Sequence, residues 1–158
     1  KSTAELIALA KELSDDVPKR ELDALLATGE QKTVALLAIA LQSLGVPAVS
    51  MTGFQSGFIT TDHHSKARIK EIDTERTEQF LKEGKVVVLT GFQGISEDGE
   101  ITTLGRGGSD TTAVAIAAIL SSFLAGTAKS IPTWLRSLPR IRKSTPTQRS
   151  STGSHMKN

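Results

Sequence analysis

The sequence predicts an α/β sandwich in which helices pack on a mostly parallel β-sheet, and three observations favour this fold class. Helical patterns alternate with short apolar strand patterns through residues 1–120. Lys85 to Thr90 carries three consecutive valines, as expected of a strand buried on both faces. A glycine-rich stretch, Gly105 to Gly108, leads within a few residues into the apolar run Ala113 to Leu120, which is typical of a tight loop that enters a helix.

The first third of the chain is expected to be helical. Ser2 to Glu5 has the spacing of a capping box, and apolar residues follow at helical intervals from Leu6 to Leu13. Pro18 suits the first turn of a second helix, and Gly29 should break or bend it. Val34 to Leu44 is apolar and long enough to form a buried helix.

The middle of the chain should alternate between strands and helices. Pro47 to Met51 is predicted to be a short buried strand, and Glu75 to Glu83 a modest helix. Glu97 to Glu100 is predicted to be the tip of a hairpin whose arms carry Phe92 and Thr103 to one end of the sheet. His63-His64 has no third metal ligand at a plausible spacing, so we expect solvated or hydrogen-bonding histidines.

Length and composition indicate one globular domain without a membrane span. The chain has 158 residues and no cysteine, which excludes disulfides and leads us to expect a cytoplasmic protein. No apolar run approaches the roughly 20 residues that cross a bilayer. Residues 1–120 hold all 17 acidic residues and 12 of the 19 Lys and Arg, whereas residues 121–158 hold the other 7. The basic pI therefore belongs to the last residues and does not by itself indicate nucleic-acid or membrane binding.

The glycine-rich loop is the strongest candidate site in the sequence. Its glycines allow a tight turn, and Ser109 or Asp110 can cap the following helix, whose first turn offers unpaired N–H groups. Arg106 adds a planar cationic fork beside them. This pattern indicates a phosphate or carboxylate site. An ordinary glycine-rich turn into a capped helix remains the alternative.

A family resemblance narrows this choice. The run Val87 to Gly94, followed by Glu100 to Ala115, resembles the substrate-site region of aspartate kinases, in the amino-acid kinase superfamily. The likeness extends back through Arg20 to Glu30, Thr52 to Gly57 and His64 to Ile69, and so covers nearly all of residues 1–120. It implies an incomplete three-layer α/β/α sandwich. It also implies transfer of the γ-phosphoryl group of ATP, with Mg²⁺, to the side-chain carboxylate of L-aspartate, which gives 4-phospho-L-aspartate, the first step toward Lys, Thr and Met.

The resemblance also implies roles for single residues. Arg106 would clamp a substrate carboxylate and Glu30 would contact the substrate amino group. Asp110 would orient the family's catalytic lysine, and Ser109 would also face the nucleotide. The full set of expected site residues is Thr3, Glu30, Arg106, Gly107, Gly108, Ser109 and Asp110, with Phe92-Gln93-Gly94 and Arg68 as further lining residues. Without the resemblance, Arg106 could be an ordinary surface arginine, and Glu30 and Asp110 could be acids at helix starts.

The sequence lacks parts that the resemblance leads us to expect. Members of the family begin with a strand and a loop whose lysine meets the ATP phosphates, and Lys1 starts after that segment. The expected nucleotide loop and regulatory domains are also missing, so we expect little kinase activity from these 158 residues alone. The full-length family is usually oligomeric. Another amino-acid kinase, or a non-catalytic module that binds aspartate or another anion, remains the alternative.

Residues 121–158 form a basic tail rich in Ser, Thr and Pro, which we expect to be disordered or frameshifted. Read in a shifted frame, Thr127 to Trp134 can encode Cys-Glu-Ile-Tyr-Thr-Asp-Val, a segment that an aspartate kinase would have next. Leu135-Arg136 cannot supply the glycine expected after it. Gly153 to Met156 also has the composition of an expression-vector scar. We hypothesise a frameshift near residues 120–126, in the gene or in its sequencing.

Overall fold

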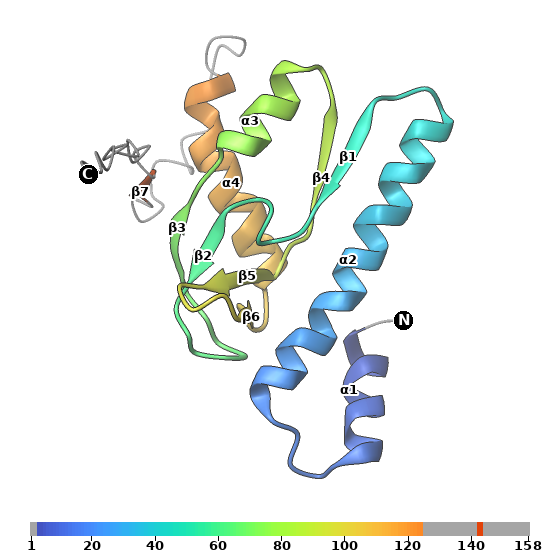
Figure 1. The fold of residues 1–158 in the computed structure, drawn as a ribbon, viewed down its shortest axis with the longest axis vertical. Coiled ribbons are helices and arrows are strands. Elements are labelled where there is room, and N and C mark those ends of the chain that lie inside the picture. Colours follow the sequence, from blue (N-terminus) through green and yellow to red (C-terminus); the bar gives the residue numbers. More distant parts are fainter. Residues whose placement is uncertain (1–2, 125–141, 144–158) are drawn as a thin grey trace, which may run out of the picture.

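The structure is a computed structural model that describes residues 3–124 and 142–143. Four helices and seven strands follow one another along these residues (Figure 1). Their order is α1 (Thr3–Leu13), α2 (Lys19–Ser43), β1 (Ala48–Met51), β2 (Phe58–Thr60), β3 (Ile69–Ile72), α3 (Glu75–Lys82), β4 (Val86–Leu89), β5 (Gln93–Ser96), β6 (Ile101–Thr103), α4 (Gly108–Leu124) and β7 (Arg142–Lys143).

The described strands form two sheets. β1 and β4 pair in parallel, with Ala48 opposite Val86 and Met51 opposite Leu89. The second sheet has the order β6-β5-β2-β3-β7, in which β2/β5 and β3/β7 are parallel whereas β2/β3 and β5/β6 are antiparallel. The alternation of helices and strands confirms the predicted α/β class.

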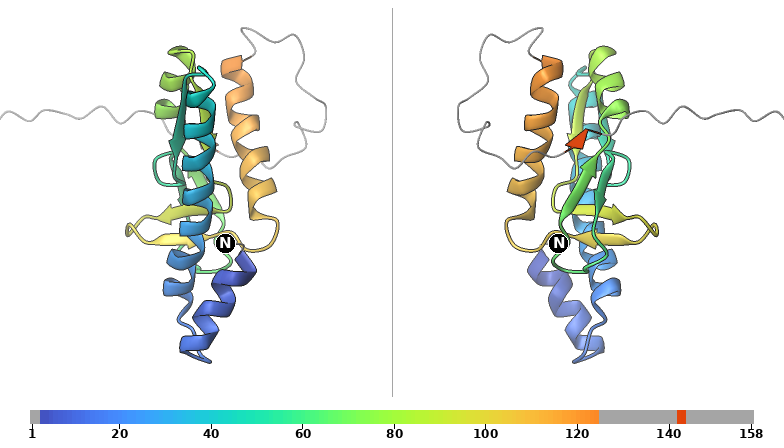
Figure 2. Two further views of the ribbon diagram at one scale, coloured as in Figure 1. Left: turned by 90° about the vertical axis from the view of Figure 1, so that its right-hand side faces the viewer. Right: turned by 90° about the vertical axis from the view of Figure 1, so that its left-hand side faces the viewer.

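Helices cover both sheets. α4 packs on the five-stranded sheet, where Ala115 and Ile119 meet the fully buried side chains of Phe58 on β2 and Ile72 on β3. α2 contacts β1, β4 and β6. Figure 2 shows α4 set apart from the layer that contains α2 and β1. The start of α4 and the middle of α2 are therefore brought to one region from opposite ends of the described chain.

α2 differs from its prediction in two ways. It runs without interruption through Gly29, because a single glycine costs a helix only about 1 kcal/mol and packing on two sheets outweighs that cost. The segment predicted to be buried is largely exposed: Leu36 is 56% exposed and Ile39 is 62% exposed. By length and composition alone α2 could cross a membrane; a single such helix is weak evidence, because core helices and signal sequences pass the same test.

The strand predictions are right in position and partly wrong in burial. β1 and β4 lie where they were expected, but β4 is not buried on both faces, since Val86 is 42% exposed and its three successors are partly buried. Among the described strands β4 pairs only with β1, so its other edge has no neighbour there. The strands β2 and β3 were not predicted, because Thr60, Lys70 and Glu71 interrupt their apolar pattern.

The predicted hairpin of residues 92–103 is confirmed. β5 and β6 pair with Gln93 opposite Thr103, and the turn lies at residues 97–100. Arg20 at the start of α2 forms an ion pair of 2.7 Å with Glu100 at this turn. Side-chain hydrogen bonds raise the pKa of Arg20 above its ordinary value; the bond to Glu21 has the largest effect, followed by the bond to Glu100. This contact links the hairpin turn to the start of α2.

Residues 125–141 and 144–158 lie outside the described part of the chain. The predictions of a frameshift and of disorder fall mainly on these residues and stay predictions, as does the domain boundary at residue 120.

Candidate amino-acid-binding site

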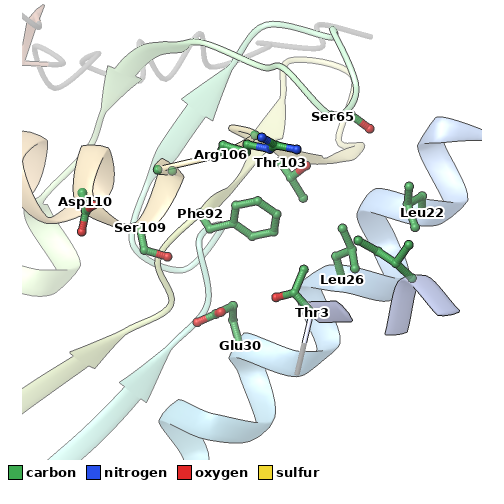
Figure 3. Close-up of a pocket in the computed structure, with 14 residues that line it drawn as sticks. Thr3, Leu22, Leu26, Glu30, Ser65, Phe92, Thr103, Arg106, Ser109 and Asp110 are labelled. Carbon is green, nitrogen blue, oxygen red and sulfur yellow. The ribbon is translucent and has the colours of Figure 1, made fainter. Parts of the chain in front are cut away.

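A cavity of about 440 Å³ opens where α1, α2 and the glycine-rich loop meet the start of α4. Figure 3 shows the Phe92 ring in the middle of this pocket, with Glu30 and Thr3 on one side and Arg106 and Thr103 on the other. The described residues that line it are Thr3, Ile7, Leu22, Leu26, Glu30, Ser65, Phe92, Thr103, Gly105, Arg106, Gly107, Gly108, Ser109 and Asp110.

Two glycines of the glycine-rich loop adopt a left-handed backbone conformation where the loop meets the pocket. Gly105 has a φ of +78° and Gly107 has a φ of +72°, backbone conformations that residues with a Cβ rarely adopt. Gly105 also lies against the Ser65 carbonyl oxygen, which is 3.0 Å from the position of a Cβ. The two glycines present Arg106 between them to the pocket.

The start of α4 differs from its prediction by one or two residues. The helix begins at Gly108, so the prediction that Ser109 or Asp110 caps it is wrong. The Gly107 carbonyl accepts hydrogen bonds from the N–H and the hydroxyl of Thr111, at 3.0 and 3.1 Å. Ser109 and Asp110 therefore lie inside the first turn, where an acid interacts favourably with the positive end of the helix dipole.

Phe92 occupies the pocket with an unusual backbone. Its φ of 71° is rare for a residue with a bulky side chain. Two hydrogen bonds hold it there: its N–H donates to the Thr112 hydroxyl at 3.0 Å, and its carbonyl accepts from the Leu104 N–H at 2.9 Å. Strained residues of this kind tend to occur at functional sites.

Glu30 and Arg106 bring opposite charges to the pocket and do not form an ion pair with each other. Within residues 3–124, neither Glu30 nor Arg106 forms an ion pair or a side-chain hydrogen bond. Glu30 is partly buried on α2, and Arg106 is exposed in the loop. A zwitterion carrying a carboxylate and an ammonium group would complement both charges, and Leu22, Leu26 and Phe92 would enclose its carbon chain.

The structure brings together every residue of the expected site set. Thr3, Glu30, Arg106, Gly107, Gly108, Ser109 and Asp110 all line the one pocket. Phe92 lines it too, but Gln93, Gly94 and Arg68 are absent from its described lining. Gln93 is instead buried under α2, where its side-chain amide donates to the Ala27 carbonyl at 3.2 Å. The functional roles of the lining residues stay predictions.

Sequence reasoning missed Asp23, which lies directly behind the pocket. Its carboxylate has no exposed surface and accepts hydrogen bonds from Ser65, Thr103 and His64. His64 is therefore a hydrogen-bonding histidine, as expected, while the neighbouring His63 is exposed beside Asp62. The one signal in the sequence was an acid on the otherwise apolar face formed by Leu22 and Leu26.

The described residues contain no group of three His, Cys, Asp or Glu side chains that could hold a metal ion. Mg²⁺ often needs only one or two carboxylates together with substrate phosphates. Asp110 and Glu30 are the carboxylates in the described lining of the pocket.

Comparison with known proteins shows which family the chain belongs to. The model of the amino acid kinase family matches residues 1–132. The chain belongs to the amino acid kinase family. Its relatives include aspartokinase 2 of Bacillus subtilis, which is 54% identical over 144 residues, or 91% of this chain and 35% of that protein. The aspartokinase of Geobacillus stearothermophilus is 57% identical over 122 residues, or 77% of this chain and 30% of that protein.

Solved structures agree with this assignment. The aspartate kinase of Synechocystis is 52% identical with a TM-score of 0.61, over 77% of this chain and 19% of that one. Escherichia coli aspartokinase III in complex with aspartate and ADP is 28% identical with a TM-score of 0.63, over 75% of this chain and 27% of that one. Our chain thus spans about a third of the curated relatives it matches.

Proposed function

We propose that this chain forms the L-aspartate-binding part of an aspartate kinase. Arg106 would bind a substrate carboxylate as a bidentate clamp, and Glu30 would bind the ammonium group. The observation that carries the proposal is that Arg106 and Glu30 line one cavity and that neither has an ion-pair partner among the residues that the structure describes. The similarity to aspartokinases, one of which was solved with aspartate and ADP, supports aspartate among amino-acid substrates.

In the proposed reaction the side-chain carboxylate of aspartate attacks the γ-phosphorus of Mg-ATP, and ADP leaves. Both reactants are anions, so the residues must hold them in line and offset negative charge rather than act as a nucleophile. Ser109 and the N–H groups at the start of α4 lie where they could meet the reacting carboxylate and the transferred phosphoryl group. Asp110 could orient a cationic residue of the complete enzyme. Mg²⁺ would supply charge neutralisation on the ATP phosphates when bound.

The reaction can be tested in a complete enzyme. Residues 1–120 of this chain would replace the matching segment of Bacillus subtilis aspartokinase 2, and aspartate-dependent ADP formation would be measured. We expect activity of the same order as that of the parent enzyme, and a fall of at least roughly tenfold in kcat/KM for aspartate with Arg106→Gln, because a charge-assisted bidentate contact is lost.

Two outcomes would favour the competing functions, and a third would contradict the role of Arg106. Activity of the chimera on glutamate in preference to aspartate would indicate a different amino-acid kinase. A chimera that folds and binds aspartate but forms no ADP would favour the non-catalytic binding module. Full ADP formation by the Arg106→Gln chimera would contradict the assigned role of the loop.

A further inference from the structure

Asp23 is a buried carboxylate that is not among the proposed substrate contacts. Its side chain nevertheless accepts five hydrogen bonds beside the pocket. Oδ2 accepts from the Ser65 N–H at 2.8 Å, the Thr103 N–H at 3.0 Å and His64 Nδ1 at 3.1 Å. Oδ1 accepts from the Thr103 hydroxyl at 2.6 Å and the Ser65 hydroxyl at 3.3 Å. A carboxylate with no exposure is costly unless donors of this kind satisfy it.

All of these donors come from outside α2. Ser65 and His64 lie in the loop between β2 and β3, and Thr103 ends β6. The same two segments are joined directly, since the Ala67 N–H donates to the Thr103 carbonyl at 2.9 Å. Asp23 therefore ties a helix, a loop and a strand end together at one point.

That point lies at the base of the glycine-rich loop. Thr103 and Ser65 both line the pocket, and the Ser65 carbonyl also touches Gly105. Arg106 follows Thr103 by three residues, so the place from which it extends is set by the hydrogen bonds of Thr103 and Ser65. Asp23 itself is absent from the described lining of the pocket.

The same helix carries the opposite charge of the pocket. Glu30 follows Asp23 by seven residues on α2, which is close to two full turns, so both side chains project from one face. Asp23 is hydrogen-bonded to the base of the Arg106 loop, and Glu30 lines the pocket about 10 Å further along the helix axis. The distance between the cationic and anionic ends of the pocket thus depends on the Asp23 contacts.

We infer that Asp23 is a positioning residue of the amino-acid pocket, acting through Thr103 and Ser65 to hold Arg106 at a fixed distance from Glu30. The identity of the ligand rests on the proposed function, but the positioning role rests on these contacts alone. A purely structural role is the competing explanation, and the two differ in what they predict for ligand affinity.

Matched variants separate these explanations. Asp23→Asn keeps the side-chain shape but removes the negative charge. Its single amide oxygen replaces a carboxylate that accepts charge-assisted hydrogen bonds from Ser65, Thr103 and His64, so these bonds become weaker. Thr103→Val removes one hydroxyl while its N–H bond to Asp23 remains, and Thr103→Ser restores that hydroxyl. Ile72→Val weakens the core between β3 and α4 at a residue that is absent from the described lining of the pocket, and it serves as the stability control.

L-Aspartate would be titrated into each variant of the 158-residue chain by calorimetry, with thermal unfolding measured in parallel. We expect at least roughly tenfold weaker binding for Asp23→Asn, weaker binding for Thr103→Val, and recovery of affinity in Thr103→Ser relative to Thr103→Val. Ile72→Val should lower the unfolding midpoint and leave the affinity unchanged. If Asp23→Asn fails to fold, the Thr103 pair decides alone. Wild-type affinity in Thr103→Val, or equal loss in Thr103→Ser, would overturn the inference.

A second readout is independent of the ligand. Amide hydrogen exchange of residues 104–109 should speed up in Asp23→Asn and Thr103→Val but not in Thr103→Ser or Ile72→Val, because only the first two release the base of the loop. If the wild type does not bind aspartate, the proposed function fails while this exchange pattern still supports the positioning role. Unchanged exchange in Asp23→Asn or Thr103→Val would overturn it.

Discussion

Glu30 and Arg106 enter the pocket from a helix and from a loop far apart in the sequence, and each lacks a partner among the described residues. Unpaired charges of opposite sign in one cavity are arranged for a ligand that carries both signs. Between them lies Phe92, whose strained backbone is held by hydrogen bonds to Thr112 and Leu104. At the scale of single residues, a small zwitterion would therefore complement the site.

Gly107 offers a direct test of the loop at this scale. In Gly107→Ala the added Cβ has no atom within 4 Å. The strain of a φ of +72° should therefore be the only cost, and it should lower the free energy of unfolding by about 1–2 kcal/mol. Gly99→Ala at the hairpin tip, with φ +86° and equally open space, is the matched control. Chemical denaturation should show similar destabilisation for both variants, whereas titration should show weaker L-aspartate binding for Gly107→Ala only. Equal affinities would show that the loop conformation does not matter for binding.

At the scale of elements, α2 is the central one. Its inner face supplies Asp23 and Glu30 to the site region and packs on β1 and β6, while its outer face exposes Leu36, Leu37 and Ile39. Apolar side chains gathered on one exposed face favour association. We therefore expect the outer face of α2 to favour association of the chain with itself.

Replacement of Leu36 and Ile39 together by Gln should reduce that association. Because neither residue lines the pocket in the described structure, L-aspartate affinity should not change. Sedimentation velocity over a range of concentrations would measure the effect, with Leu13→Gln as control, a substitution at a residue that is 90% exposed on α1. Concentration-dependent association that persists unchanged in the double variant would contradict the expectation.

Sequence patterns predicted α3, β1, β4 and the β5–β6 hairpin, because apolar runs and turn residues are local signals. They did not predict that α2 continues through Gly29 or that β2 and β3 pair, since tertiary packing overrides propensity at these places. The glycine-rich loop identified Arg106, and family resemblance identified Glu30. Asp23 could not be found, because its partners, Ser65 and Thr103, come from distant segments and only the fold brings them together.

At the scale of the whole molecule, the chain corresponds to one part of the longer relatives that it matches. It belongs to the amino acid kinase family and spans about a third of its curated relatives, yet the pocket residues expected from the family meet within the described part of it. Residues 1–120 are acidic overall, and the excess of basic residues lies after them. Because the chain spans only part of its relatives, binding of aspartate can be tested on this chain, and transfer of a phosphoryl group is tested in a complete enzyme.

The most direct test of the central claim is a calorimetric comparison of L-aspartate with succinate, which keeps both carboxylates but lacks the ammonium group. The wild-type chain should bind aspartate at least roughly tenfold more tightly than succinate, because the ammonium group forms a charge-assisted contact with Glu30. Glu30→Gln should lose this preference, whereas Arg106→Gln should weaken the binding of both ligands. Equal binding of the two ligands by the wild type, or an undiminished preference in Glu30→Gln, would contradict the assignment of this pocket to an amino acid.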